Sequence, residues 1–249
     1  MSRNSFASML VQRFGAIFFT VGKVVRFGLY FFFIYFLLKG ATALAGYGMN
    51  QVIFFFLTFT FIDTVSQFLY REVYRFRPLI VSGGFDLVLV KPVSPLFRSL
   101  MGGADVLDLL TIPPLAVAVY LIGRTLGPSL VETAYFVLLL INGLLIATAF
   151  HIAVISLGII TLEIDHTVMI YRDLTSLGRF PIDIFRQPLR GILTYLLPVG
   201  IMISLPAKAL MGLVSASGVF FSFVLGLALV FLAIKFWNFA LTKYTSASS

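Results

Sequence analysis

Three side chains that could bind a cation or move a proton stand close together, because Glu163, Asp165 and His166 fall within four residues. Carboxylates and imidazole are common ligands of divalent metals. The same residues also fit the polar first turn of a helix, where acidic side chains are stabilised by the helix dipole. We favour the helix start, because His151, the other histidine, lies well before the group in the chain. We therefore predict no metal site.

Recognisable catalytic motifs are missing from the rest of the sequence. It contains no G-x-x-x-x-G-K-[ST], no H-E-x-x-H and no G-x-S-x-G. It also has no cysteine, which excludes disulfides and thiolate chemistry. We therefore predict that the chain is not an enzyme, needs no cofactor and binds no nucleotide through a P-loop. Two alternatives stay open: a membrane-embedded enzyme that uses Glu163, Asp165, His166 or Asp63, and a passive channel or scaffold.

The composition shows which kind of protein must position these residues. Hydrophobic residues make up 60% of the 249 residues, charged residues only 11%, and phenylalanine alone accounts for 28 positions. The mean hydropathy is +1.04. A soluble globular chain carries roughly 25% charged residues. The sequence therefore predicts an all-α integral membrane protein.

The net charge of +8 is distributed as expected for a membrane protein rather than a nucleic-acid-binding protein. The segment 71–98 has a net charge of +3, and the tail from Lys235 has a net charge of +2. Cationic segments resist translocation and remain in the cytoplasm beside anionic lipids. Both termini and segment 71–98 are therefore predicted to be cytoplasmic, with membrane lipids as partners and no nucleic acid. The N-terminal region supports this with four cations and no acid in its first 26 residues: Arg3, Arg13, Lys23 and Arg26.

The cytoplasmic loop 71–104 contains a short apolar segment that is preceded by two glycines and followed by two prolines. Gly83-Gly84 interrupts the chain before FDLVLV, and KPVSP ends that run with two prolines. The spacing predicts a short helix that presents Phe85 and Leu89, at positions i and i+4, to the groove of a partner. The alternative is a basic loop that is merely solvated.

The apolar runs predict six transmembrane helices. A single transmembrane domain over 1–249 begins with an amphipathic interfacial helix within 1–23, or with an early start of the first span. The first span needs the small residues 40–46 to reach about 20 residues. The fourth span is long enough to require a tilt or a break near His151. The clear spans are at about 24–38, 50–70, 105–123, 132–161 and 219–239.

The region 163–211 allows two interpretations. Hydropathy alone makes 163–190 cytoplasmic and 192–211 the fifth span. Alternatively, 163–180 is a polar fifth span, and 181–211 enters the outer leaflet and returns. Both interpretations give six spans with both termini inside.

Asp63 is an acid within the second span, two to three turns from its cytoplasmic end. A charge at that depth is costly and is usually paired. Arg26 lies at a similar depth if the first two spans form a hairpin, and we predict that it pairs with Asp63. The alternative is that Asp63 lies in a water-filled vestibule or beside another subunit.

Three separated motifs resemble those of permease subunits of export-type (type 2) ABC transporters, in the branch of uncharacterised substrate. The first follows the second span, and the family pattern there is G, hydrophobic, D, then L-x-[KR]-P-[LV]-S-P-L-F. This chain has Lys91 where the family usually has Arg, so the positive charge is kept. The second is FPIDIFRQPLRGILTYLLPVGIMISLPAKAL, and the third is the ending from Trp237 to Ser249. The first motif is carried here by Gly84, Phe85, Asp86, Leu89, Lys91, Pro92, Val93, Ser94, Pro95, Leu96 and Phe97.

The resemblance implies the export-type permease fold in a bacterial cytoplasmic (inner) membrane. It also implies a second permease, homologous or identical, and two copies of a separate ABC ATPase that hydrolyses the ATP. The loop after the second span would then contain the helix that couples to the ATPase, and 181–211 would be a re-entrant outer segment. The residues predicted for coupling are Gly83, Gly84, Phe85, Asp86, Leu89, Lys91, Pro92, Ser94 and Pro95.

Overall fold

The computed structural model describes residues 13–40, 43–103 and 106–245, and this part of the chain is helical almost throughout. The elements in chain order are α2 (Arg13–Lys39), α3 (Met49–Leu69), η1 (Arg71–Arg75), α4 (Phe76–Val81), α5 (Gly84–Leu89), α6 (Pro95–Met101), α7 (Val106–Arg124), α8 (Leu130–Thr161), α9 (Ile164–Ser176), η2 (Leu177–Arg179), η3 (Ile182–Ile184), α10 (Leu189–Gly191), η4 (Ile192–Leu196), η5 (Gly200–Ser204), α11 (Leu205–Leu210) and α12 (Ala216–Thr242).

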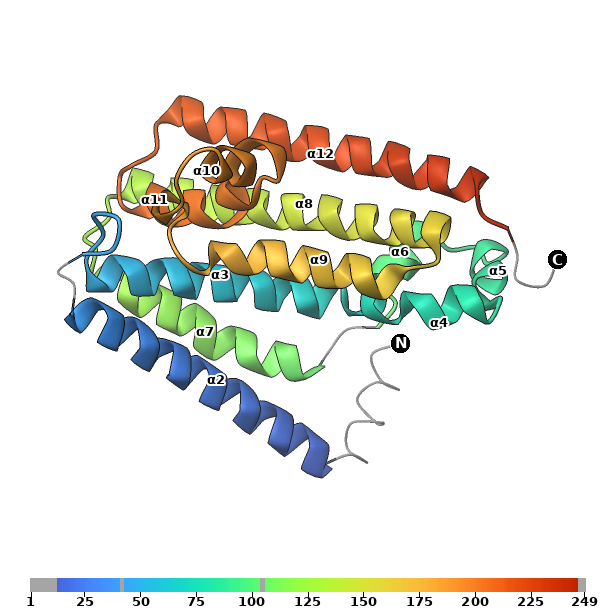
Figure 1. Ribbon diagram of the computed structural model, residues 1–249, viewed down its shortest axis with the longest axis horizontal. Helices are drawn as coiled ribbons and strands as arrows, with labels where there is room; N and C mark the ends of the chain where they lie inside the picture. Colours follow the sequence, from blue (N-terminus) through green and yellow to red (C-terminus); the bar gives the residue numbers. More distant parts are fainter. Residues whose placement is uncertain (1–12, 41–42, 104–105, 246–249) are drawn as a thin grey trace.

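The long helices run side by side along the long axis of the molecule (Figure 1). At one end lie α4, α5 and α6 with the end of α12, and we call this the loop end. At the other end, the far end, lie the turns α2–α3 and α7–α8, together with α10 and α11. Segments that the charge pattern assigns to the cytoplasm therefore gather at a single end.

The centre of the bundle is α8, which contacts α12, α11, α9 and α3. Its start is fixed by a reciprocal cap, in which the Glu132 backbone N–H donates to Ser129 Oγ over 3.3 Å and the Glu132 carboxylate accepts from the Ser129 backbone N–H. The helix is 32 residues long and runs unbroken past His151 to Thr161. Of the two expectations for this length, a tilt or a break near His151, the break is absent. The His151 ring Nδ1 lies 2.7 Å from the Ala147 carbonyl, one turn back in the same helix.

The first span differs from its prediction. It ends at Lys39, and the chain then makes a tight turn in which Leu44 and Tyr47 exchange two backbone hydrogen bonds of 3.0 Å each. Residues 43–46 therefore do not lengthen the span as a helix. The rest of the predicted extension includes 41–42, which lie outside the described residues. The extra length comes from the N-terminal side, where the apolar part of α2 begins at Val21.

The predicted interfacial helix lies mostly outside the described residues. From Arg13 onward the chain already belongs to α2, so 13–23 is continuous with the first span.

Within the described residues, four helices are long and apolar enough to cross a membrane: α2 from Val21, α3, α8 and α12. A fifth candidate is the bent pair Leu189–Leu196 and Gly200–Leu210, whose two halves meet at 77°. Pro198 lies at the break between the halves. The structure thus shows an all-helical membrane protein with four to five candidate spans.

Gly143 marks a close contact between α8 and η5. A Cβ added there would lie 2.5 Å from the Met202 backbone oxygen, which cannot move without shifting η5. Gly143→Ala is therefore expected to lower the unfolding free energy by about 1–3 kcal/mol, the usual range for overpacking. The measurement is thermal unfolding in detergent. The matched control is Gly28→Ala, because a Cβ at Gly28 meets nothing within 4 Å; equal melting temperatures for the two variants would contradict this packing.

Candidate functional site

The loop 71–103 folds into a compact set of short helices at the loop end. Gly83 adopts the left-handed conformation with φ 72°, which lets α4 turn sharply into α5. Pro95 occupies the first turn of α6, and the Ser94 hydroxyl caps that helix by accepting from the Phe97 backbone N–H. Gly83 thus provides the interruption before FDLVLV that the sequence predicts, whereas the Ser94 cap of α6 was not predicted.

Phe85 does not point outward as predicted. Its side chain is 0% exposed, and its ring packs edge-on against Phe76 at 5.2 Å, Tyr244 at 5.1 Å and Trp237 at 6.3 Å between ring centroids. The prediction was wrong because the end of α12 packs against α5 and buries this face. Phe85 is therefore an anchor that holds α5 to the bundle.

Asp86 adds a polar contact to the same junction. Its carboxylate accepts a hydrogen bond of 3.0 Å from the Tyr244 hydroxyl. Burial first, and then this hydrogen bond and the Asp86 charge, raise the pKa of Tyr244. The Tyr244 hydroxyl therefore remains a donor at neutral pH, and the C-terminal end of α12 is tied to α5.

The outward side of α5 presents other apolar residues. Leu87 is 64% exposed and Val90 is 79% exposed, whereas Leu89 is only 36% exposed. Val93 and Phe97 are exposed beside them, and a cavity of about 150 Å³ lies between Val93, Phe97 and Met101. Lys91, Pro92 and Ser94 are exposed at the same tip. We call Leu87, Val90 and Val93 the tip surface.

One ion pair lies within the loop, and a second joins the loop to α9. Arg98 Nη1 lies 3.0 Å from Glu72 Oε1, which joins α6 to η1. Arg77 Nη1 lies 2.9 Å from Asp165 Oδ2, which joins α4 to the start of α9. A loop that is packed against the bundle through Phe85 can transmit a displacement of its tip to the spans.

The acid and histidine group at 163–166 forms the beginning of α9. Glu163 precedes the first turn and lies 2.9 Å from His166 Nδ1, while Asp165 faces Arg77. In the described part of the chain, no three such side chains are arranged to hold a metal ion.

Asp63 lies among several cations rather than in one pair. Its carboxylate accepts a 2.8 Å hydrogen bond from Gln67 Nε2, one turn along α3. The charges of Arg26, Arg172 and Arg179 all act on it, but within the described residues Arg26 and Asp63 do not form an ion pair. The predicted partner is thus one of three nearby cations, and the pairing with Arg26 stays a prediction.

Two further polar contacts, which join α2 to η2 and α2 to α7, were not predicted. Arg179 donates a 2.8 Å hydrogen bond to the Tyr30 hydroxyl, and its guanidinium lies over the rings of Tyr30 and Phe59. Lys23 forms an ion pair with Asp108, which joins α2 to α7. Each pair combines residues far apart in the sequence, so no local pattern could reveal it.

Asp63→Asn and Arg26→Gln are each expected to reduce assembly or transport, and Arg26→Gln less so, because Arg172 and Arg179 remain when Arg26 is removed. In a double-mutant cycle, a coupling of about 0.5–3 kcal/mol between Asp63 and Arg26 is expected for residues that share one network. The cycle is measured by thermal or denaturant unfolding. Simple additivity of the two changes would show that Arg26 does not act on Asp63.

A second charged cluster, also missed from the sequence, lies at the far end. Asp183 Oδ2 lies 2.6 Å from Lys208 Nζ and accepts a 3.0 Å hydrogen bond from the Tyr47 hydroxyl, and Arg190 pairs with the other oxygen. Burial acts to raise the pKa of Asp183, but Lys208, Tyr47 and Arg190 outweigh it and hold the pKa below its ordinary value. The lone Lys208 within an apolar run was the sequence signal for this cluster.

The depressed pKa of Asp183 makes part of the stability dependent on pH. Its ionised form stabilises the fold above the unfolded pKa of about 3.9, and this contribution is lost as the pH falls through the lower folded pKa. Asp183→Asn is therefore expected to lower the melting temperature at pH 7. The difference in melting temperature between this variant and the unaltered chain should become smaller below about pH 4. Asp173→Asn, at an exposed acid of α9, is the control; a gap that is constant from pH 7 to pH 3 would contradict the ion cluster.

The comparison with known families gives one match. The model of a family described as "ABC-2 family transporter protein" matches residues 24–248. No curated protein and no solved structure matches the chain.

Proposed function

Because the chain belongs to the ABC-2 family of transporter membrane proteins, we propose that it is the membrane-spanning permease of an ABC exporter, driven by a separate ATPase. Two copies of that ATPase bind below the membrane, and a second permease, homologous or identical, completes the pathway. The direction of transport and the bacterial cytoplasmic membrane rest on the sequence resemblance. The observation that carries the proposal is the tip surface: apolar, exposed, and anchored to the spans through Phe85.

ATP can drive a chain without a P-loop only through contact with a protein that has one. Exposed apolar residues at the end of a rigid loop suit such a contact, because burying them at an interface is favourable by about 25 cal/mol per Å². Leu87 and Val90 have this exposure. The pair Arg98–Glu72 joins α6 to η1 within the loop, and Arg77–Asp165 joins the loop to α9. The loop 71–104 is therefore our coupling element.

The directions of the helices support six membrane crossings. The helices α2, α3, α7 and α8 alternate in direction between the loop end and the far end, and α12 runs in the same direction as α8 (Figure 1). We count α9 with η2 as the fifth crossing, because it leaves the loop end after α8 and runs toward the far end. The bent segment 181–211 then stays at the far end as the re-entrant outer segment, and both termini are cytoplasmic.

The polar surface of α9 supports a second permease. Arg172 and Asp173 are exposed on this helix, and lipid chains do not solvate such charges. If α9 crosses the membrane, this surface faces a second subunit or an aqueous pathway. Cargo would then move beside α9.

Purification from native membranes tests the proposal. The tagged chain should retain an ATPase with a Walker motif, at one ATPase per permease, and ATP hydrolysis should belong to that partner alone. Two copies with different tags, expressed together, show whether the second permease is identical. If the tagged chain purifies from its native membranes without any ATPase, the proposal is contradicted.

A further inference from the structure

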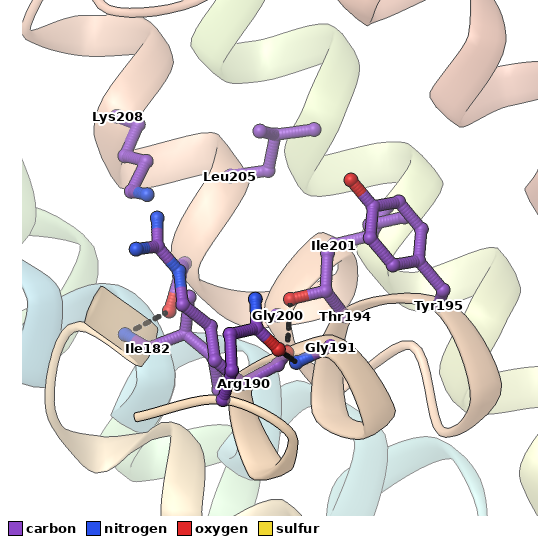
Figure 2. A pocket seen from close by; sticks show the side chains of 11 residues that line it. Ile182, Arg190, Gly191, Thr194, Tyr195, Gly200, Ile201, Leu205 and Lys208 are labelled. Atoms are coloured by element: carbon purple, nitrogen blue, oxygen red, sulfur yellow. Dashed lines mark hydrogen bonds between the residues drawn. The ribbon is translucent and has the colours of Figure 1, made fainter. Parts of the chain in front are cut away.

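A cavity of about 310 Å³ opens among the short helices of the far end. Its lining comes from η3, α10, η4, η5 and α11, which places it inside the segment 181–211. The polar side chains that line it are Gln187, Arg190, Thr194, Tyr195, Ser204 and Lys208. Figure 2 shows the charged ends of Arg190 and Lys208 meeting at one side of the cavity, with Tyr195 at the other.

The two cations keep donors available after they pair with Asp183. A guanidinium has five N–H donors and an ammonium has three. Asp183 accepts one contact from Arg190 and one from Lys208. Two positive charges share a single carboxylate here, so the cluster retains a net charge of +1 and unused N–H groups beside the cavity.

Two neutral donors, from Gln187 and Ser204, lie beside these cations. The Gln187 side-chain oxygen accepts from the Gly191 backbone N–H at 3.1 Å, so the amide nitrogen of Gln187 remains as a donor. Ser204 Oγ accepts from the Ile182 backbone N–H, which leaves its own O–H available. The polar lining of the cavity therefore offers mainly donors, as an oxygen-rich anion requires.

We propose that this cavity binds a phosphate group, either the head of a membrane amphiphile or a free phosphate compound. An arginine and a lysine side by side are suited to phosphate, because the guanidinium can form two parallel hydrogen bonds and the ammonium adds a point charge. The volume exceeds what a carboxylate needs. Apolar Ile201 and Leu205 line the same cavity and Tyr195 is exposed at its edge, which suits a head that carries acyl chains.

This site goes beyond the proposed function, because it requires neither the ATPase nor a second permease. The full-length protein in detergent would be titrated with phosphatidylglycerol and with diacylglycerol of the same chains, and bound lipid would be counted by native mass spectrometry. Phosphatidylglycerol is expected to bind, and diacylglycerol is not. Inorganic phosphate, titrated alone, distinguishes the sources: binding as tight as that of phosphatidylglycerol indicates a soluble phosphate compound, and much weaker binding indicates a lipid head.

Variants identify the binding groups. Arg190→Met and Lys208→Met are each expected to weaken phosphatidylglycerol binding about tenfold, as the loss of a charge-assisted hydrogen bond does. Gln187→Met leaves the Asp183 cluster intact and should weaken binding severalfold, so the proposal remains testable if the cationic variants do not fold. Arg186→Met is the matched control, because Arg186 is exposed nearby but does not line the cavity. Equal binding of diacylglycerol, or an Arg186→Met effect as large as that of Arg190→Met, would overturn the proposal.

Discussion

Replacing Leu87 and Val90 together with aspartate is expected to abolish ATPase binding while the chain remains folded and inserted. Both side chains are exposed on the outward side of α5, so the change removes no internal packing. Burying two such side chains at an interface contributes on the order of 2–4 kcal/mol, and two carboxylates there add a desolvation cost. The ATPase affinity should fall at least a hundredfold. The measurement is co-purification and the dissociation constant in detergent.

The matched control is Leu130→Asp. Leu130 is also strongly exposed, but it lies at the start of α8, away from the loop end. It should leave ATPase binding unchanged. If the double variant binds the ATPase as tightly as the unaltered chain, the tip surface is not where the ATPase binds.

Phe85→Ala should have a different effect from the changes at the tip surface, because its side chain is internal. Its ring fills the space between Phe76, Trp237 and Tyr244. Truncating a buried phenylalanine costs about 3–5 kcal/mol. We expect α5 to detach from α12, so that limited proteolysis cuts near Ser82 and transport is lost although the spans remain inserted.

Phe220→Ala is the control for this change. Phe220 lies on α12, but its side chain is exposed, so its removal should cost little. A Phe85→Ala protein that resists proteolysis as well as the Phe220→Ala protein does would contradict the anchoring role of Phe85.

The composition and apolar runs were enough to predict the membrane class and most of the long helices. The helices α3, α7, α8 and α12 begin and end within a turn of their predictions. Strongly apolar runs between polar segments leave little freedom in where a helix can lie. The motif from Gly84 to Phe97 likewise identified the family, which the family match over 24–248 confirms.

The orientation of α5 could not be predicted, because it depends on a distant element. Phe85 and Leu89 are neighbours on an isolated helix, and only the approach of Trp237 and Tyr244 decides which of the two is buried. A six-residue helix has too little periodicity to show its inner side. The loop could therefore be located from the sequence, but the prediction that Phe85 lies on its outer surface was wrong.

The charged clusters could not be predicted for a similar reason. Asp63 was recognised as a costly intramembrane acid, but Arg172 and Arg179 approach it only because α9 runs back along the bundle. Asp183 and Lys208 meet because the segment between them bends by 77° at its break. Pairing across such distances is set by packing, which a single sequence does not reveal.

The central claim is that the tip surface binds an ABC ATPase, and crosslinking at one position tests it most directly. A photoreactive amino acid at Leu87 should give, on irradiation of native membranes, one adduct that contains the ATPase. The same amino acid at Leu213, an exposed residue of the far end, should give none. An ATPase adduct from Leu213, or its absence from Leu87 in membranes where both proteins are present, would contradict the account.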